Sequence, residues 1–144
     1  MCEKNDKCLV VYVDGSYSPT KKKAGYGIVY IEDNVVIGTE SGLADKYLET
    51  RNIAGELTAA ARALIWAMKH GYKTIQLHYD YAGIEKWVNG EWEAKKECSA
   101  MYKEYMLNLI EKYQLSVTFK KIKSHSGDLY NNVADTLAKE ALTM

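Results

Sequence analysis

Four acidic residues in separate parts of the chain have the chemistry to hold divalent metal ions: Asp14, Glu56, Asp80 and Asp135. Asp14 and Asp80 each end a β-branched or aromatic run, CLVVYVD and TIQLHYD. Glu56 and Asp135 each lie within an apolar pattern of helical spacing. Carboxylates that gather at one edge of a sheet repel one another unless positive charge lies between them. Oxygen ligands of this kind suit Mg²⁺, and paired ions catalyse the hydrolysis of phosphodiesters.

Each of these residues alone also has a simpler interpretation. Asp14 precedes a glycine and could mark a turn, and Glu56 could be a surface residue favoured by the helix dipole. Asp80 could cap a following helix, and Asp135 could be a solvated residue beside the packing stripe of its helix. His125, in the loop KSHSGD, suits a group that moves protons, although a single loop histidine usually has no special role. The functional interpretation therefore depends on the four carboxylates converging.

The elements that must position these residues follow from hydrophobic periodicity and turn residues. Asp33-Asn34 is typical of a hairpin turn, Gly71 of a helix end, and Asp128 of a helix N-cap. We expect strands at 8–14, 24–32, 35–43, 74–80 and 115–122, a loop at 16–23, and helices at 52–70, 81–89, 98–113 and 128–142.

This βββαβααβα order predicts an α/β fold. Strand–helix–strand connections favour parallel pairing, so strands 1, 4 and 5 should run parallel, while strands 1–3 form an antiparallel meander. The result is a five-stranded mixed sheet with helices on both faces. Asp14 and Asp80 would then terminate parallel strands at the carboxyl edge, where open α/β sheets bind their ligands.

Composition fits one globular domain over residues 1–144, with 1–7 as a disordered N-terminus. Three cysteines without CxxC spacing, and no apolar leader or membrane-spanning run, favour a cytoplasmic protein without structural zinc. The formal net charge is zero, so any contact with nucleic acid must rely on local lysine clusters, at 21–23, 95–96 and 120–123. Zero charge, with no coiled coil or exposed apolar stretch evident, also favours a monomer.

Four segments together resemble ribonuclease H of type 1: DGSY at 14–17, NIAGELTAA at 52–60, LHYDY at 77–81 and KSHSGDLYNNVADTLA at 123–138. The resemblance runs from about Leu9 to Leu142. It implies a ribonuclease-H-like fold and an endonuclease that cleaves the RNA strand of RNA/DNA hybrids, leaving 5′-phosphate and 3′-hydroxyl ends. It also implies two Mg²⁺ ions, replaceable by Mn²⁺, at the scissile phosphate.

The resemblance also assigns roles to individual residues. Asp14, Glu56, Asp80 and Asp135 match the family's metal-binding carboxylates, and His125 matches its catalytic-loop histidine. Residues expected to contact substrate are Gly15, Ser16, Asn52, Trp92 and Asn131.

The chain differs from many relatives in two respects. Tyr81 stands where many have serine after the third carboxylate, and the segment WVNGEWEAKKECSAMYKEY is short and mixed in charge where many have a basic protrusion. We therefore expect weak, salt-sensitive hybrid binding. The alternatives are a DNA-directed nuclease of the resolvase or transposase type on the same fold, and a catalytically dead hybrid-binding module.

Overall fold

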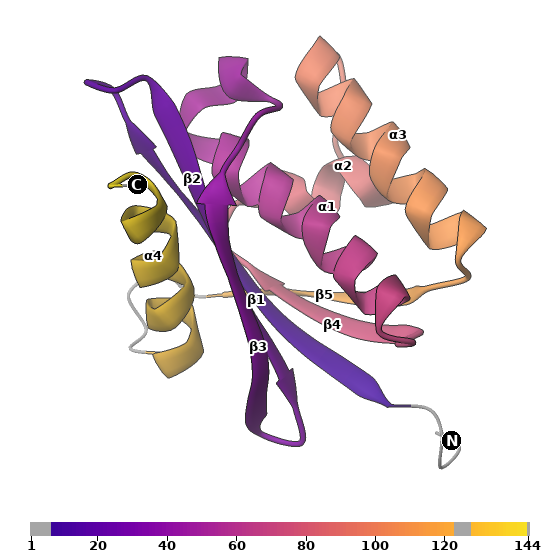
Figure 1. The fold of residues 1–144 in the computed structure, drawn as a ribbon. Coiled ribbons are helices and arrows are strands. Elements are labelled where there is room, and N and C mark those ends of the chain that lie inside the picture. Colours follow the sequence, from indigo (N-terminus) through magenta and orange to yellow (C-terminus); the bar gives the residue numbers. More distant parts are fainter. Residues whose placement is uncertain (1–6, 123–127, 144) are drawn as a thin grey trace.

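The computed structural model describes residues 7–122 and 128–143, which form a five-stranded sheet flanked by helices (Figure 1). The sheet order is β3-β2-β1-β4-β5. In chain order the elements are β1 (Cys8–Ser18), β2 (Lys23–Glu32), β3 (Val35–Leu43), the 3-10 helix η1 (Leu48–Ile53), α1 (Ala54–Lys69), β4 (Thr74–Tyr79), α2 (Gly83–Asn89), α3 (Glu97–Lys112), β5 (Ser116–Lys121) and α4 (Leu129–Ala141).

The pairing of the strands is the one expected from the order of elements. β1 pairs antiparallel with β2, and β2 with β3, while β1, β4 and β5 run parallel. The β2–β3 turn is tight because Asp33 and Asn34 both adopt positive φ, 52° and 65°. The predicted meander and mixed sheet are therefore confirmed.

The expectation that the first strand ends in a turn at Asp14, followed by a loop over 16–23, is wrong. β1 continues to Ser18, and its last residues pair with the start of β2 down to Ser18↔Lys23. The parallel register with β4, however, extends only to Tyr12↔His78. Asp14 therefore lies inside a strand, just beyond the end of its parallel ladder.

The two faces of the sheet are covered by different helices. α1, α2 and α3 lie on one side and α4 on the other (Figure 1). The side chains of β1 alternate between these layers, as strand geometry requires. Leu9, Val11 and Val13 pack in the cluster with α1, whereas Tyr12 packs in the cluster with Ala134 of α4. The same alternation turns Asp14 toward α4.

The predicted helix at 52–70 begins later than expected. Residues 48–53 form the separate 3-10 helix η1, in which Arg51 has non-helical angles (φ 53°, ψ −97°). α1 itself starts at Ala54, so Asn52 lies before that helix and not one turn above Glu56 within it. At the other end Gly71, with φ of 82°, stops the helix as predicted.

The N-cap predicted at Asp128 is confirmed. Its Oδ1 accepts hydrogen bonds from the backbone amides of Tyr130 and Asn131, at 3.0 and 3.3 Å. Its Oδ2 accepts another from the Tyr12 hydroxyl at 3.2 Å, which ties the start of α4 to β1. Tyr12 in turn stacks on His78 of β4, with ring centroids 4.2 Å apart.

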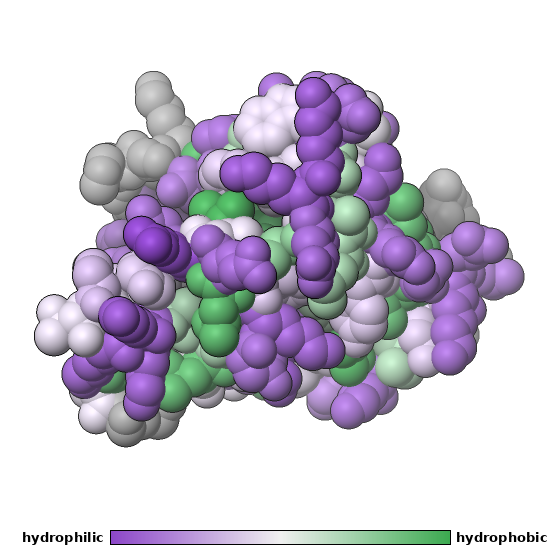
Figure 2. Space-filling view, turned by 90° about the horizontal axis from the view of Figure 1, so that it is seen from above, coloured by the Kyte–Doolittle hydropathy of each residue, from purple (hydrophilic) through white to green (hydrophobic). Residues whose placement is uncertain are grey.

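The molecular surface is mixed in character. Figure 2 shows hydrophilic side chains across the upper face, with narrower apolar areas between them. The expectation of no exposed apolar stretch is wrong on β3, where Val35, Val36 and Ile37 are all exposed. Within the described part of the chain, no helix is both long and apolar enough to cross a lipid bilayer.

Candidate active site

The start of α1 is held against the sheet by contact between two backbones. A Cβ atom added to Gly15 of β1 would lie 2.5 Å from the backbone nitrogen of Glu56, and one added to Gly55 would lie 2.1 Å from the carbonyl oxygen of Gly25. Neither position has room for a side chain. The glycines therefore bring the first turn of α1 directly onto β1 and β2, and they carry Glu56 with it.

Glu56 is buried, with 5% of its surface exposed, and it bridges α1 to the end of β4. Its Oε2 accepts hydrogen bonds from the backbone amides of Asp80, at 2.7 Å, and Tyr81, at 3.1 Å. Burial raises the pKa of Glu56 from 4.5 to about 8, the two amides oppose this rise, and the negative charges of Asp14 and Asp80 add to it. Removing this acid from water thus has a large electrostatic cost.

On the opposite face, α4 approaches the sheet just as closely. A Cβ atom on Gly27 would lie 2.1 Å from the carbonyl oxygen of Ala134, and one on Gly25 would lie 2.2 Å from that of Ala138. The two small alanines on α4 are fully buried at this contact. Asp135 follows the first of them, so this close packing brings its carboxylate to β1.

Asp14 is where the groups from the two faces meet. Its Oδ1 accepts a hydrogen bond from the Gly15 amide at 2.8 Å, and its carboxylate interacts electrostatically with that of Asp135. Burial raises the pKa of Asp14 from 3.8 to about 7, the Gly15 amide opposes the rise, and the charges of Asp135 and Asp80 add to it. The structure thus makes Asp14 an electrostatic neighbour of Asp135, Asp80 and Glu56.

The donor chemistry of this group fits hard divalent ions, which prefer carboxylate oxygens. Glu56 is buried and Asp14 half-buried beside other carboxylates, and a bound cation would offset the cost of their charges. The acids interact as neighbours. Among the described residues, however, no three Asp, Glu, His or Cys side chains are placed so that they could hold one metal ion between them.

The other candidate residues surround this centre in different ways. Gly15 lies between Asp14 and Glu56 and serves as a packing contact for α1, and Ser16 continues β1 opposite Gly25. Asn52 is exposed on η1, and Asn131 is half-buried in the first turn of α4. His125 lies outside the described residues.

Trp92 belongs to an aromatic cluster that begins next to the acids. Its ring lies 6.1 Å from that of Tyr81 and 6.0 Å from that of Trp87, and Lys86 Nζ lies 5.6 Å from its centroid. Tyr81 and Trp87 also line a pocket of about 530 Å³, together with Thr50, Lys95, Lys96 and six further residues: Glu49, Ile53, Glu93, Glu97, Cys98 and Ser99. Trp87 packs against the core, while Trp92 is exposed.

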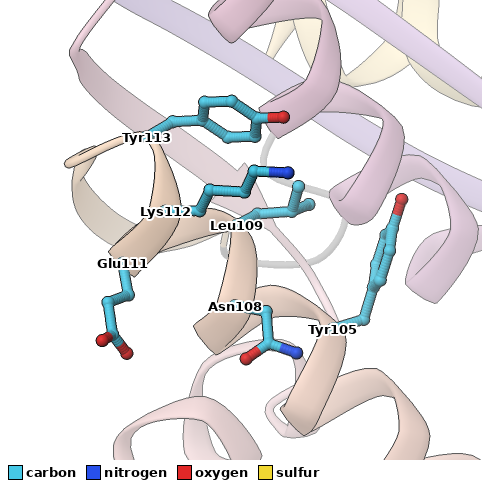
Figure 3. Close-up of a pocket in the computed structure, with 6 residues that line it drawn as sticks. All are labelled: Tyr105, Asn108, Leu109, Glu111, Lys112 and Tyr113. Carbon is cyan, nitrogen blue, oxygen red and sulfur yellow. The ribbon is translucent and has the colours of Figure 1, made fainter.

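A second hollow, of about 620 Å³, lies elsewhere along α3 (Figure 3). None of the candidate site residues lines it, and its lining includes one lysine and one glutamate. The lining residues are Tyr105, Asn108, Leu109, Glu111, Lys112 and Tyr113. The chemistry expected from the sequence is therefore concentrated at the carboxylates and not in this larger space.

Residues 6–143 match the family model for RNase H. The chain belongs to the RNase H family. Curated relatives support this assignment along most of the chain. The Ribonuclease H of Ehrlichia ruminantium (strain Gardel) is 32% identical over 144 residues, which cover 93% of this chain and 94% of that protein. The Ribonuclease H of Orientia tsutsugamushi (strain Boryong) is 30% identical over 145 residues, 93% of this chain and 82% of that protein.

Solved structures of RNase H1 proteins share the fold. The RNase H1 of the halophilic archaeon Halobacterium salinarum NRC-1 superposes with a TM-score of 0.80 at 22% identity, covering 94% of this chain and 98% of that one. LC11-RNase H1, solved in complex with an RNA/DNA hybrid, gives a TM-score of 0.75 at 17% identity, over 93% and 99% of the two chains. The family, the fold and the class of ribonuclease H enzyme expected from the sequence are confirmed.

Sequence reasoning missed Gly25, Gly27 and Gly55 as determinants of the site. Gly25 and Gly27 could have been found, because a glycine inside a strand often marks a close approach of two backbones, whereas Gly55 lies in α1. Gly25 and Gly27 are two residues apart on β2 and therefore face the same side, toward α4.

Proposed function

We propose that this RNase H family member cleaves the RNA strand of RNA/DNA hybrids with the help of two Mg²⁺ ions. Asp14, Glu56, Asp80 and Asp135 would hold these ions. The observation that supports this most is that Asp14 interacts with the carboxylates of Asp135, Asp80 and Glu56, which come from three other segments, at the junction of β1, β4, α1 and α4. The solved complex of LC11-RNase H1 with an RNA/DNA hybrid supports the choice of substrate.

The four acids would contribute differently because their exposure differs. Glu56 is buried and Asp14 half-buried, and the hydrogen bonds from the amides of Asp80 and Gly15 fix one oxygen of each. Asp80 is exposed and the Asp135 side chain is 40% exposed, so both can be reached by a scissile phosphate. When bound, the ions would supply Lewis-acid assistance to phosphodiester hydrolysis, with Mn²⁺ able to replace Mg²⁺. The products would carry 5′-phosphate and 3′-hydroxyl ends.

The remaining candidates would bind the nucleic acid around this centre. His125, which precedes α4 in the chain, is proposed to transfer a proton during turnover. Gly15, Ser16, Asn52 and Asn131 are proposed to contact the hybrid near the cleaved bond, where only the ribose 2′-hydroxyl distinguishes RNA from DNA chemically. Trp92, exposed at the end of the aromatic cluster, is proposed to stack on the substrate further away.

Binding should be weak and strongly dependent on salt. The chain has zero formal net charge, so attraction to phosphates must come from local lysines such as Lys95 and Lys96. We also propose a cytoplasmic monomer, on the odd number of cysteines without CxxC spacing and on the zero net charge. Equal hybrid affinity at low and high salt, or a dimer in sedimentation at working concentration, would contradict these two points.

The deciding experiment offers the protein four matched substrates with Mg²⁺ or Mn²⁺: RNA/DNA hybrid, duplex DNA, duplex RNA and single strands. An Asp80→Asn variant serves as the control, since it keeps the shape of the side chain and removes its charge. Cleavage of the hybrid's RNA strand alone, abolished by the substitution, is expected. Cleavage of duplex DNA would indicate the DNA-directed alternative, and binding without cleavage would indicate a catalytically inactive hybrid-binding module.

A further inference from the structure

Lys139 lies one helical turn after Asp135 on α4 and forms an ion pair with it. The Lys139 Nζ is 3.0 Å from Asp135 Oδ2, and the two side chains are 66% and 40% exposed. Residues four apart on a helix face the same side, which explains why the two side chains meet. The other ion pairs found among the described residues join no candidate metal ligand: Arg62–Glu40, Lys86–Glu91 and Lys95–Glu93.

The position of Lys139 relative to the acids is set by the packing of α4. Asp135 follows Ala134 and Lys139 follows Ala138, the two alanines whose carbonyl oxygens lie against Gly27 and Gly25. The backbone of both residues is therefore held at the sheet, and the flexible stem of the lysine is the part free to move. Asp14 also attracts the ammonium group, so Lys139 stands at the edge where two of the site's carboxylates meet.

We infer that Lys139 is a positioning residue that acts through Asp135, as an internal counter-ion that competes with a divalent ion for this carboxylate. The inference rests on the proposed function, because it presumes that Asp135 binds metal. An ammonium group hydrogen-bonded to Oδ2 occupies an oxygen that a metal would use, and two cations at one carboxylate repel each other. Lys139 therefore lowers the affinity of the site for its ion.

The competition is modest, because exposed ion pairs are weak and a lysine side chain can turn into solvent. Exposed pairs of this kind contribute up to about 1 kcal/mol, which corresponds to a change of about fivefold in a dissociation constant. Lys139 thus weakens metal binding without preventing it, and it neutralises part of the acidic cluster before the ion arrives.

The test measures Mn²⁺ binding in the absence of nucleic acid, so that phosphate contacts by Lys139 do not contribute. The full chain is titrated calorimetrically as wild type, Lys139→Gln, Lys139→Arg and Lys69→Gln. The last variant removes an equal charge from an exposed lysine at the end of α1. We expect Lys139→Gln to bind Mn²⁺ about two- to fivefold more tightly, while Lys139→Arg and Lys69→Gln stay within twofold of wild type. The Mn²⁺ concentration for half-maximal cleavage should shift in the same direction.

The inference is overturned if Lys139→Gln binds Mn²⁺ equally or more weakly, or if Lys69→Gln or Lys139→Arg tightens binding to the same extent. Thermal unfolding in chelator shows that each variant is folded before titration. An Asp135→Asn variant separates this inference from the proposed function. If wild type binds no Mn²⁺, or if Asp135→Asn binds it as wild type does, the assignment of Asp135 as a metal ligand is itself wrong.

Discussion

Replacing Glu56 with glutamine should make the metal-free protein more stable and, at the same time, inactive. Glutamine has nearly the same shape, and its carbonyl oxygen can accept the hydrogen bonds that the amides of Asp80 and Tyr81 donate to Glu56. The substitution therefore removes an acid whose ionisation is disfavoured by burial, and it keeps the local contacts. Activity should disappear because a proposed metal ligand has lost its charge.

The magnitude follows from the pKa of Glu56, which burial raises from 4.5 to about 8. Because the folded protein binds this proton more tightly than the unfolded chain, the stability that Glu56 contributes is complete below pH 4.5 and is lost as the pH rises toward 8. At pH 7 the loss amounts to about 3 kcal/mol, or roughly 10 °C in Tm for a chain of this size.

The assay is thermal or urea unfolding in a chelating buffer, from pH 4 to pH 8.5 in steps, for wild type, Glu56→Gln and Glu104→Gln. Glu104 is exposed on α3, so its substitution should change stability little at any pH. The difference between Glu56→Gln and wild type should be small near pH 4 and should grow between pH 4.5 and pH 8. Added Mg²⁺ should stabilise wild type more than Glu56→Gln, since only wild type keeps the complete ligand set. The reasoning is refuted if Glu56→Gln is no more stable than wild type at pH 7 without metal.

Three further substitutions test the elements around the site. Gly27→Ala should lower the free energy of unfolding by about 1–3 kcal/mol and reduce kcat, since its Cβ would lie 2.1 Å from the Ala134 carbonyl oxygen. Urea titration measures the loss. The control is Gly38→Ala, whose nearest contact would be 3.3 Å and which should lose little stability. Asp128→Ala removes the acceptor for two amides at the start of α4 and should cost about 1 kcal/mol by the same titration, a loss that Asn at this position would largely prevent. Trp92→Ala should weaken hybrid binding about fivefold in fluorescence anisotropy with a cleavage-deficient protein, and an unchanged Kd would remove Trp92 from the substrate surface.

Periodicity and turn residues were sufficient to predict the sheet and its helices. The alternation of Ile75, Leu77 and Tyr79 on β4 gives the buried face that the pattern indicates. Asp33-Asn34 and Gly71 mark their turn and helix end correctly, because positive φ restricts which residues are suitable. These are local properties, and local reasoning recovers them.

Two boundaries depended on tertiary contacts and were therefore predicted wrongly. An Asp-Gly pair usually favours a turn, but Gly15 stays in β1 because it pairs with Tyr26 and leaves room for α1. Similarly, the helix-favouring residues before Ala54 form η1, since Arg51 departs from helical geometry ahead of the close contact at Gly55.

Within the site, the residue types were readable from the sequence and their electrostatic coupling was not. Nothing in the spacing of Asp14 and Asp135 indicates that their carboxylates interact, because that interaction requires α4 to pack on β2. The ion pair of Asp135 with Lys139 could have been found, since the two residues are four apart on one helix.

At the glycine contacts of β1 and β2, only the backbone of the sheet lies between α1 and α4, with no side chains in between. At Gly25 the two helices press from opposite sides, with Gly55 against its carbonyl oxygen and Ala138 against its α-carbon. A methyl group added on either side would push a helix away from the sheet, and it would separate Glu56 of α1 or Asp135 of α4 from Asp14 of β1. Redesign of this protein therefore has almost no freedom at these glycine contacts.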